Sequence, residues 1–235
     1  MARILITVPP LTGHVNPALS VAAELERNGH EVRWAVHAAL TGALLPASAS
    51  ILDLPIETAF MAGLQEKSQK VRGLASVQFL YEDFCVPLAR RSLAPLEQVV
   101  RTFQPDLILC DHQMLAGALV ARRLQIPWLS LVTTSASILK LSHVDVVEKW
   151  VVGQLRGLQD DYGLSASVSC ERPDFSPYGV IVFSSPELVG DQHERFAATY
   201  HFVGPAFSHR PQSIEFPWQR LDPAAQKVLV SLGTV

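Results

Sequence analysis

Cysteine is scarce in this sequence. Its three cysteines, Cys85, Cys110 and Cys170, lie far apart and show none of the paired spacings of a zinc site or a disulfide-stapled domain. The sequence therefore predicts no metal site. Unpaired thiols of this kind are typical of a protein of the reducing cytoplasm.

A surplus of basic charge and long hydrophobic runs are also missing. The net charge is −3 at pH 7 and the pI is about 6.2, so no cationic excess exists to neutralise nucleic-acid phosphates. The longest apolar runs, such as ILITV from Ile4, have the length of strands and are far too short for a transmembrane helix. The first of them stops at Pro9 and Pro10 and makes a poor signal peptide. We expect no nucleic-acid binding, no transmembrane segment and a cytoplasmic location.

What the sequence does contain is a regular alternation of strand-like and helix-like segments over 235 residues. Strands are predicted at 4–8, 31–36, 51–54, 106–111 and 128–132, and again from Gly179 and from His201. Helical patterns are predicted at 17–28, over much of 59–103 and at 113–124. Strands separated by helices predict an α/β fold, a doubly wound, mostly parallel Rossmann-like sheet with helices on both faces.

The first predicted helix has clear end signals. Asn16 is a suitable N-cap, Pro17 suits the first helical position, and Gly29 suits the position after the last turn. These signals predict that residues 9–15 form a loop between the first strand and the helix.

The composition changes near the C-terminus. Four prolines occur among polar residues between Pro205 and Pro223, which predicts a linker over 205–227 after a domain of 1–204. KVLVSLGTV then restarts a strand at Val228. We interpret 228–235 as the first strand of a second domain that the sequence does not continue, the alternative being an edge strand of the first domain.

The chemistry-bearing loop is PPLTGHVNP, from Pro9 to Pro17. In the usual order of a doubly wound sheet, the first strand lies beside the fourth, which here ends at Asp111, and ligands bind where the strand order reverses. His14 and Asp111 are therefore expected to approach each other. A carboxylate on one ring nitrogen would fix the tautomer of the imidazole, and the pair would suit proton abstraction from a hydroxyl.

Each of these residues has a structural alternative. His14 could be a solvated residue of a Gly/Pro/Asn loop, and Asp111 could simply cap the following helix. His112 should point to the opposite side of an extended chain and have a structural role. Thr133, Thr134 and Ser135 follow the fifth strand and could bind substrate hydroxyls or form a turn. The apolar segment 60–84 could line a pocket, although core packing is the favoured interpretation.

Motifs of other enzyme classes are absent. The first strand is not followed by G-x-G-x-x-G, which weakens a dinucleotide-dependent dehydrogenase as an alternative. The sequence also contains no Walker loop, no H-E-x-x-H and no G-x-S-x-G.

Several segments, in order along the chain, resemble the UDP-glycosyltransferase family, especially bacterial macrolide and natural-product glycosyltransferases. They are ILITVPPLTGHVNPALSVAAELERNGHEVRWAV, PDLILCD, IPWLSL, HFVGP and VLVSLGTV. The resemblance implies one half of a GT-B fold, in which two Rossmann-like domains face each other across a cleft. It further implies an inverting transfer of a sugar from a nucleotide sugar, UDP- or dTDP-linked, to a small lipophilic hydroxyl acceptor, with no metal.

The resemblance assigns roles to individual positions. His14 corresponds to the base of the family's G-H-x-x-P loop and Asp111 to its carboxylate partner. Thr12, Gly13, Asn16 and the 133–135 group would lie at the acceptor. Gly233 and Thr234 would lie near the donor diphosphate.

The sequence departs from the family in lacking the C-terminal half, which carries most donor contacts. We therefore expect the 235 residues alone to have little or no transfer activity. Two alternatives stay open: a MurG-like transferase of lipid-linked glycans, for which the loop has too few glycines, and a non-catalytic acceptor-binding subunit of a two-chain transferase.

Overall fold

The computed structural model describes residues 1–134, 138, 145–165, 168–190, 194, 196–206, 217–228 and 230. Within them, one sheet contains seven strands in the order β3-β2-β1-β4-β5-β6-β7, and every adjacent pair is parallel. The strands are β1 Arg3–Thr7, β2 Glu31–Val36, β3 Ile51–Asp53, β4 Leu107–Asp111, β5 Trp128–Val132, β6 Val180–Val182 and β7 Tyr200–Phe202. The α/β doubly wound prediction is confirmed, including the placement of β1 beside β4.

Helices connect these strands. The longer ones are α1 Thr12–Arg27, α3 Thr58–Ser68, α5 Val86–Phe103, α6 Leu115–Leu124 and α7 Asp145–Asp161. The shorter ones are α2 Ala38–Thr41, η1 Gly42–Leu44, α4 Leu74–Gln78, the π-helix η2 Phe79–Cys85, α8 Pro186–Val189 and the 3₁₀ turn η5 Trp218–Arg220. Among the described residues, no helix combines the length and the hydrophobicity that a membrane crossing requires.

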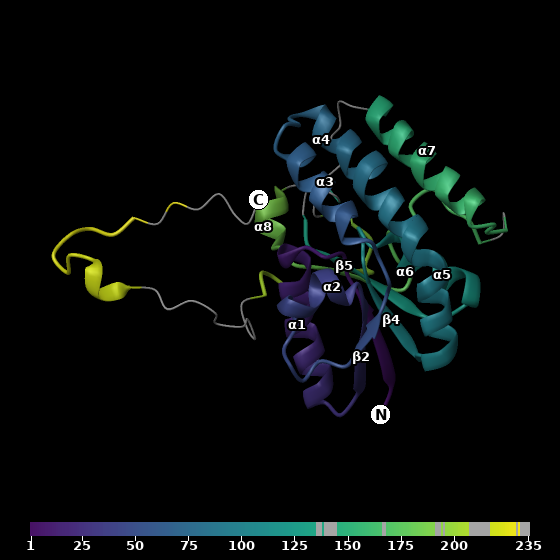
Figure 1. Ribbon diagram of the computed structural model, residues 1–235, viewed down its shortest axis with the longest axis horizontal. Coiled ribbons are helices and arrows are strands. Elements are labelled where there is room, and N and C mark those ends of the chain that lie inside the picture. The colour runs from purple at the N-terminus through teal and green to yellow at the C-terminus, as the bar shows by residue number, and fades with distance from the viewer. Residues whose placement is uncertain are drawn as a thin grey trace.

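The two faces of the sheet are buried by different helices, as Figure 1 shows for α1 on one side and α5 and α6 on the other. Alternate residues of β1 explain this arrangement. Ile4 and Ile6 pack with the apolar face of α1, whereas Leu5 between them packs with the cluster formed by α5, α6 and α7. Strands that are covered on both faces are apolar at most positions, which is why β1, β4 and β5 read as near-continuous hydrophobic runs in the sequence.

The first helix begins earlier than the sequence signals indicate. Leu11, in an extended conformation, precedes Thr12, and its carbonyl oxygen accepts hydrogen bonds from the backbone N–H groups of His14 and Val15. Pro17 consequently lies inside α1, and Asn16 is not its N-cap. The consequence for the site is that His14 belongs to the first turn of a helix and not to a loop.

The segment after the sheet is largely exposed. The described residues 217–228 are all exposed, and Val228 and Val230 keep 84% and 80% of their accessible surface. Leu229 and residues 231–235 lie outside the described residues, so the proposed division at 204 and 228 stays a prediction.

The contact between α6 and the sheet depends on a glycine. A β-carbon on Gly117 would overlap Cys110 Sγ and lie 2.6 Å from Thr7 Cγ2, and both neighbours are buried. We expect Gly117→Ala to lower the free energy of unfolding by about 1–3 kcal/mol, because the helix would have to move away from a packed sheet.

Urea denaturation followed by circular dichroism measures this effect. Gly153→Ala is the matched control, because Gly153 is exposed on α7 and a β-carbon there meets nothing within 4 Å. That control should stabilise the protein by about 0.5–1 kcal/mol through helix propensity. Equal effects of the two substitutions would contradict the packing argument.

Candidate active site

Three side chains from distant parts of the sequence meet at the carboxyl edge of the sheet. His14 follows β1, Asp111 is the last residue of β4, and Thr133 directly follows β5. His14 Nδ1 lies 2.9 Å from Asp111 Oδ2 and 2.8 Å from Thr133 Oγ1. Because β1, β4 and β5 are adjacent and parallel, their carboxyl ends bring these residues together. The predicted approach of His14 to Asp111 is therefore present in the structure.

Asp111 is fully buried, and every neighbour of its carboxylate stabilises the ionised form. Oδ1 accepts the backbone N–H of Gln113 at 2.9 Å, while Oδ2 faces His14. Burial by itself would raise the pKa of Asp111, but attraction to His14 and His112 and the hydrogen bonds from His14 and Gln113 outweigh it and lower the pKa. The carboxylate is thus charged near neutral pH and can only accept hydrogen bonds.

The capping alternative for Asp111 applies only in a modified form. Helix α6 begins at Leu115 after Met114, without a side-chain cap. Asp111 instead closes the short turn that leads to the helix, since its carboxylate accepts from Gln113 and its carbonyl oxygen accepts from the backbone N–H of Met114. The side chain therefore holds the turn and contacts His14 at the same time.

His112 is the main neighbour that the sequence interpretation placed wrongly. The prediction assumed an extended chain, but β4 ends at Asp111 and residue 112 lies in a turn, so strand alternation does not apply. The ring of His112 stacks on that of His14 with centroids 6.0 Å apart, and its Nδ1 contacts the carbonyl oxygen of Leu131 at 3.2 Å. Burial lowers the pKa of His112, which makes the neutral imidazole the dominant form at pH 7.

Phe175 extends this stack and had no signal in the sequence. Its ring lies 6.4 Å from that of His112 at an interplanar angle of 7°, and the guanidinium carbon of Arg172 lies 4.6 Å from the Phe175 ring centroid. Arg172 in turn forms a two-point ion pair with the buried Asp174. The ring of His112, which stacks on His14, is thus held in place by Phe175, and Phe175 by the Arg172–Asp174 ion pair.

The other predicted site residues differ in how closely they approach the pair. Thr12 and Asn16 are half-buried and Gly13 is exposed, all in the first turns of α1 next to His14. Thr134 is half-buried beside Thr133. Ser135, Gly233 and Thr234 lie outside the described residues.

The apolar segment 60–84 packs mainly against the core. Phe84 is buried in the cluster that α5 and α6 share, and Phe60, Met61, Leu80 and Tyr81 are partly buried against it. The favoured interpretation, core packing, agrees with these contacts.

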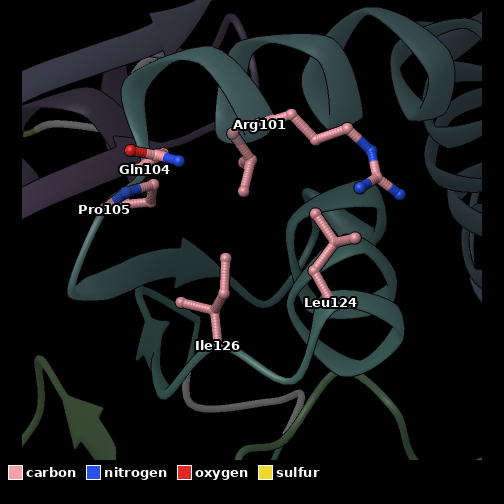
Figure 2. Close-up of a pocket in the computed structure, with 6 residues that line it drawn as sticks. Arg101, Gln104, Pro105, Leu124 and Ile126 are labelled. Carbon is pink, nitrogen blue, oxygen red and sulfur yellow. The ribbon is translucent and has the colours of Figure 1, made fainter.

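A surface pocket lies at the opposite edge of the sheet. It has a volume of about 400 Å³ and is lined by residues at the ends of α5 and α6 and at the starts of β4 and β5, as Figure 2 shows. Pro105 and Ile126 precede the strands whose other ends carry Asp111 and Thr133. The hollow is therefore separated from His14 by the length of the sheet, and we assign the chemistry to the His14 edge because the buried ionic contacts are there.

This arrangement suits proton transfer. An ionised Asp111 accepts a hydrogen bond from a proton held on Nδ1 of His14, which leaves the lone pair on Nε2 to act as a base. Among the described residues, no group of three or more His, Cys, Asp and Glu side chains could hold a metal ion.

Comparisons with known proteins identify relatives of the chain. No protein-family model matches it. It is 29% identical to the NDP-glycosyltransferase YjiC of Bacillus subtilis (strain 168) over 96% of this chain and 56% of the relative. It is 25% identical to demethyllactenocin mycarosyltransferase of Streptomyces fradiae over 100% of this chain and 53% of the relative. The chain thus spans a little more than half the length of these curated relatives.

A solved structure shares the fold. The glycosyltransferase SsfS6 of Streptomyces sp. SF2575 superposes with a TM-score of 0.60 at 21% identity, over 80% of this chain and 52% of that one. Together with the seven-stranded parallel sheet, this match identifies the architecture as that of part of a GT-B glycosyltransferase. The chain is therefore similar in sequence to bacterial glycosyltransferases, shares the architecture of one part of a GT-B fold, and corresponds to about half the length of such proteins.

Proposed function

We propose that the chain is the acceptor-binding half of an inverting glycosyltransferase, in which His14 is the general base and Asp111 orients it. The observation that carries the proposal is the 2.9 Å contact between His14 Nδ1 and the buried carboxylate of Asp111 at the carboxyl edge of the sheet. Folding alone gives little reason for a fully buried, ionised carboxylate beside a histidine, because an apolar pair would cost less to bury.

The reaction is a single displacement. Nε2 of His14 takes the proton of the acceptor hydroxyl, whose oxygen attacks the anomeric carbon of the sugar as the bond to the nucleoside diphosphate breaks. The anomeric configuration inverts because attack and departure occur on opposite faces. Asp111 stabilises the imidazolium that forms, and the nucleoside diphosphate leaves with the bonding electron pair.

The names of the relatives support a choice of substrates. A mycarosyltransferase among them suggests a lipophilic natural-product hydroxyl as acceptor. A second crystal structure of SsfS6 was solved with thymidine diphosphate, which supports a dTDP- or UDP-sugar donor.

Within this proposal, residues 1–204 bind the acceptor. Residues 205–227 link them to a donor-binding half that begins at 228, where Gly233 and Thr234 would approach the diphosphate. Three unpaired cysteines suit a cytoplasmic location.

Reconstitution tests the proposal. The 235 residues are continued with the part of the YjiC relative that this chain does not match, and transfer from a dTDP- or UDP-sugar to a panel of lipophilic hydroxyl acceptors is followed by mass spectrometry. We expect turnover by the joined protein, inversion at the anomeric carbon by NMR, and little or none by the 235 residues alone.

One control and two contrary outcomes make the experiment decisive. The YjiC portion alone should transfer nothing, which shows that the acceptor half comes from this chain. Acceptor binding by the joined protein without any transfer would instead support a non-catalytic binding subunit. Retention of the anomeric configuration in the product would contradict the single displacement.

A further inference from the structure

Thr133 lies unusually close to the catalytic pair. Its Oγ1 is 2.8 Å from His14 Nδ1 and 3.5 Å from Asp111 Oδ2, while those two atoms are 2.9 Å apart. One ring nitrogen therefore faces two oxygens at hydrogen-bond distance. The three side chains form a closed triangle at the ends of β1, β4 and β5.

The position of each proton in this triangle follows from the charge on Asp111. An ionised carboxylate can only accept hydrogen bonds. If Nδ1 carried no proton, its lone pair would face the lone pairs of the carboxylate and the two groups would repel each other. Nδ1 must then carry the proton and share it between Asp111 Oδ2 and Thr133 Oγ1. The hydroxyl proton of Thr133 is left to point toward Asp111 Oδ2, its other neighbour in the triangle.

We propose that Thr133 is a positioning residue that holds the His14 imidazole in its Nδ1-protonated form and keeps Nε2 directed at the acceptor. The proposal rests on the proposed function, but it gives Thr133 a different task from substrate binding. Within the triangle its hydroxyl accepts a hydrogen bond from the imidazole and donates one to the carboxylate. A ring rotated by half a turn would place a C–H group against both oxygens and lose both hydrogen bonds.

The first experiment measures the tautomer of His14 by two-bond ¹H–¹⁵N correlation NMR on the 235-residue chain, without donor or turnover. In the unaltered protein we expect the Nδ1-protonated pattern to dominate. Thr133→Val keeps the shape and removes the hydroxyl, and we expect it to shift the tautomer ratio toward Nε2–H by about two- to tenfold, the effect of one lost hydrogen bond. Thr133→Ala should do the same if valine does not fit.

Matched variants separate the hydroxyl from general disturbance. Thr133→Ser keeps the oxygen and should recover the tautomer ratio. Thr134→Val removes the neighbouring hydroxyl, which takes no part in the described hydrogen bonds of His14 and Asp111, and should leave the ratio as it is. An unchanged ratio in folded Thr133→Val and Thr133→Ala overturns the proposal.

The second experiment uses the reconstituted transferase. We expect Thr133→Val to lower kcat by about tenfold while the acceptor KM stays within about twofold, and Thr133→Ser to recover most of the lost rate. A raised KM with unchanged kcat would make Thr133 a substrate contact and overturn the proposal. The NMR result does not depend on transfer, so a failure of the proposed function and a failure of this inference are distinguishable.

Discussion

Replacing His14 with alanine in the reconstituted transferase is expected to lower kcat by about 10²–10⁴-fold, the usual contribution of a positioned general base. The physical reason is that the acceptor hydroxyl would have to lose its proton to water. The other imidazole nearby, that of His112, is held by the contact of its Nδ1 with the carbonyl oxygen of Leu131. Acceptor affinity should change little, because the base contributes mainly in the transition state.

Steady-state kinetics and acceptor titration by calorimetry measure the two effects separately. His201→Ala is the matched control, because His201 is exposed on the edge strand β7, three strands away from β4. It should retain full kcat. If His14→Ala kept a tenth or more of kcat, the assignment of the base would be wrong, whatever the acceptor.

Replacing Asp111 with asparagine should lower kcat by a similar factor, but for a different reason. The introduced amide could present its N–H groups to His14, which would favour a lone pair on Nδ1 and move the proton to Nε2. The imidazole would then be in the wrong tautomer to accept a proton from the acceptor. The corresponding substitution in a Ser-His-Asp triad lowers kcat by about 10⁴-fold, and we expect a loss of about 10³–10⁴-fold here.

The same substitution should also change how stability depends on pH. Because the pKa of Asp111 is lowered in the folded protein, its ionised form adds stability above its unfolded pKa of about 3.9, and that stability is lost as pH falls through the lower folded value. We expect Asp111→Asn to lower the free energy of unfolding by about 1–3 kcal/mol at pH 7. The difference from the unaltered protein should shrink below about pH 4.

Urea denaturation at pH 7 and at about pH 3.5 or lower, below the unfolded pKa, would measure this change. Asp160→Asn serves as the control, because Asp160 is exposed on α7 and should give a small, nearly pH-independent difference. A stability difference at Asp111 that stayed constant over this pH range would contradict the ionised, hydrogen-bonded carboxylate.

Much of the sheet could be predicted from the sequence because its strands are covered on both faces. Continuous apolar runs such as 128–132 coincide with the observed β5, and the order of β1 and β4 follows from the handedness of crossovers. The same topology brought His14 and Asp111 together before any contact was known. Among the strands, the differences are at the ends, as at β1, which runs from Arg3 to Thr7, whereas helix α7 at Asp145–Asp161 was not predicted.

The features of the site that could not be predicted depend on contacts between residues that form no recognisable pattern in the sequence. Asn16 and Pro17 favour a helix start at their own position, yet the carbonyl oxygen of Leu11 provides an earlier one, so His14 lies in the helix. The stack of His112 on His14 requires the turn after β4, and Phe175 joins it from a distant segment. The π-helix η2 likewise has no periodicity that distinguishes it from its α-helical neighbours.

The separation of the three triangle residues along the chain has a consequence for folding. His14 is 97 residues from Asp111 and 119 from Thr133, so the triangle closes only after β4 and β5 have docked beside β1. Contacts of such long range form late, because the entropy of closing the intervening chain must be overcome first. A chain arrested before β4 has docked beside β1 would therefore contain no His14–Asp111 pair, and the first appearance of that contact would mark the docking of these two strands.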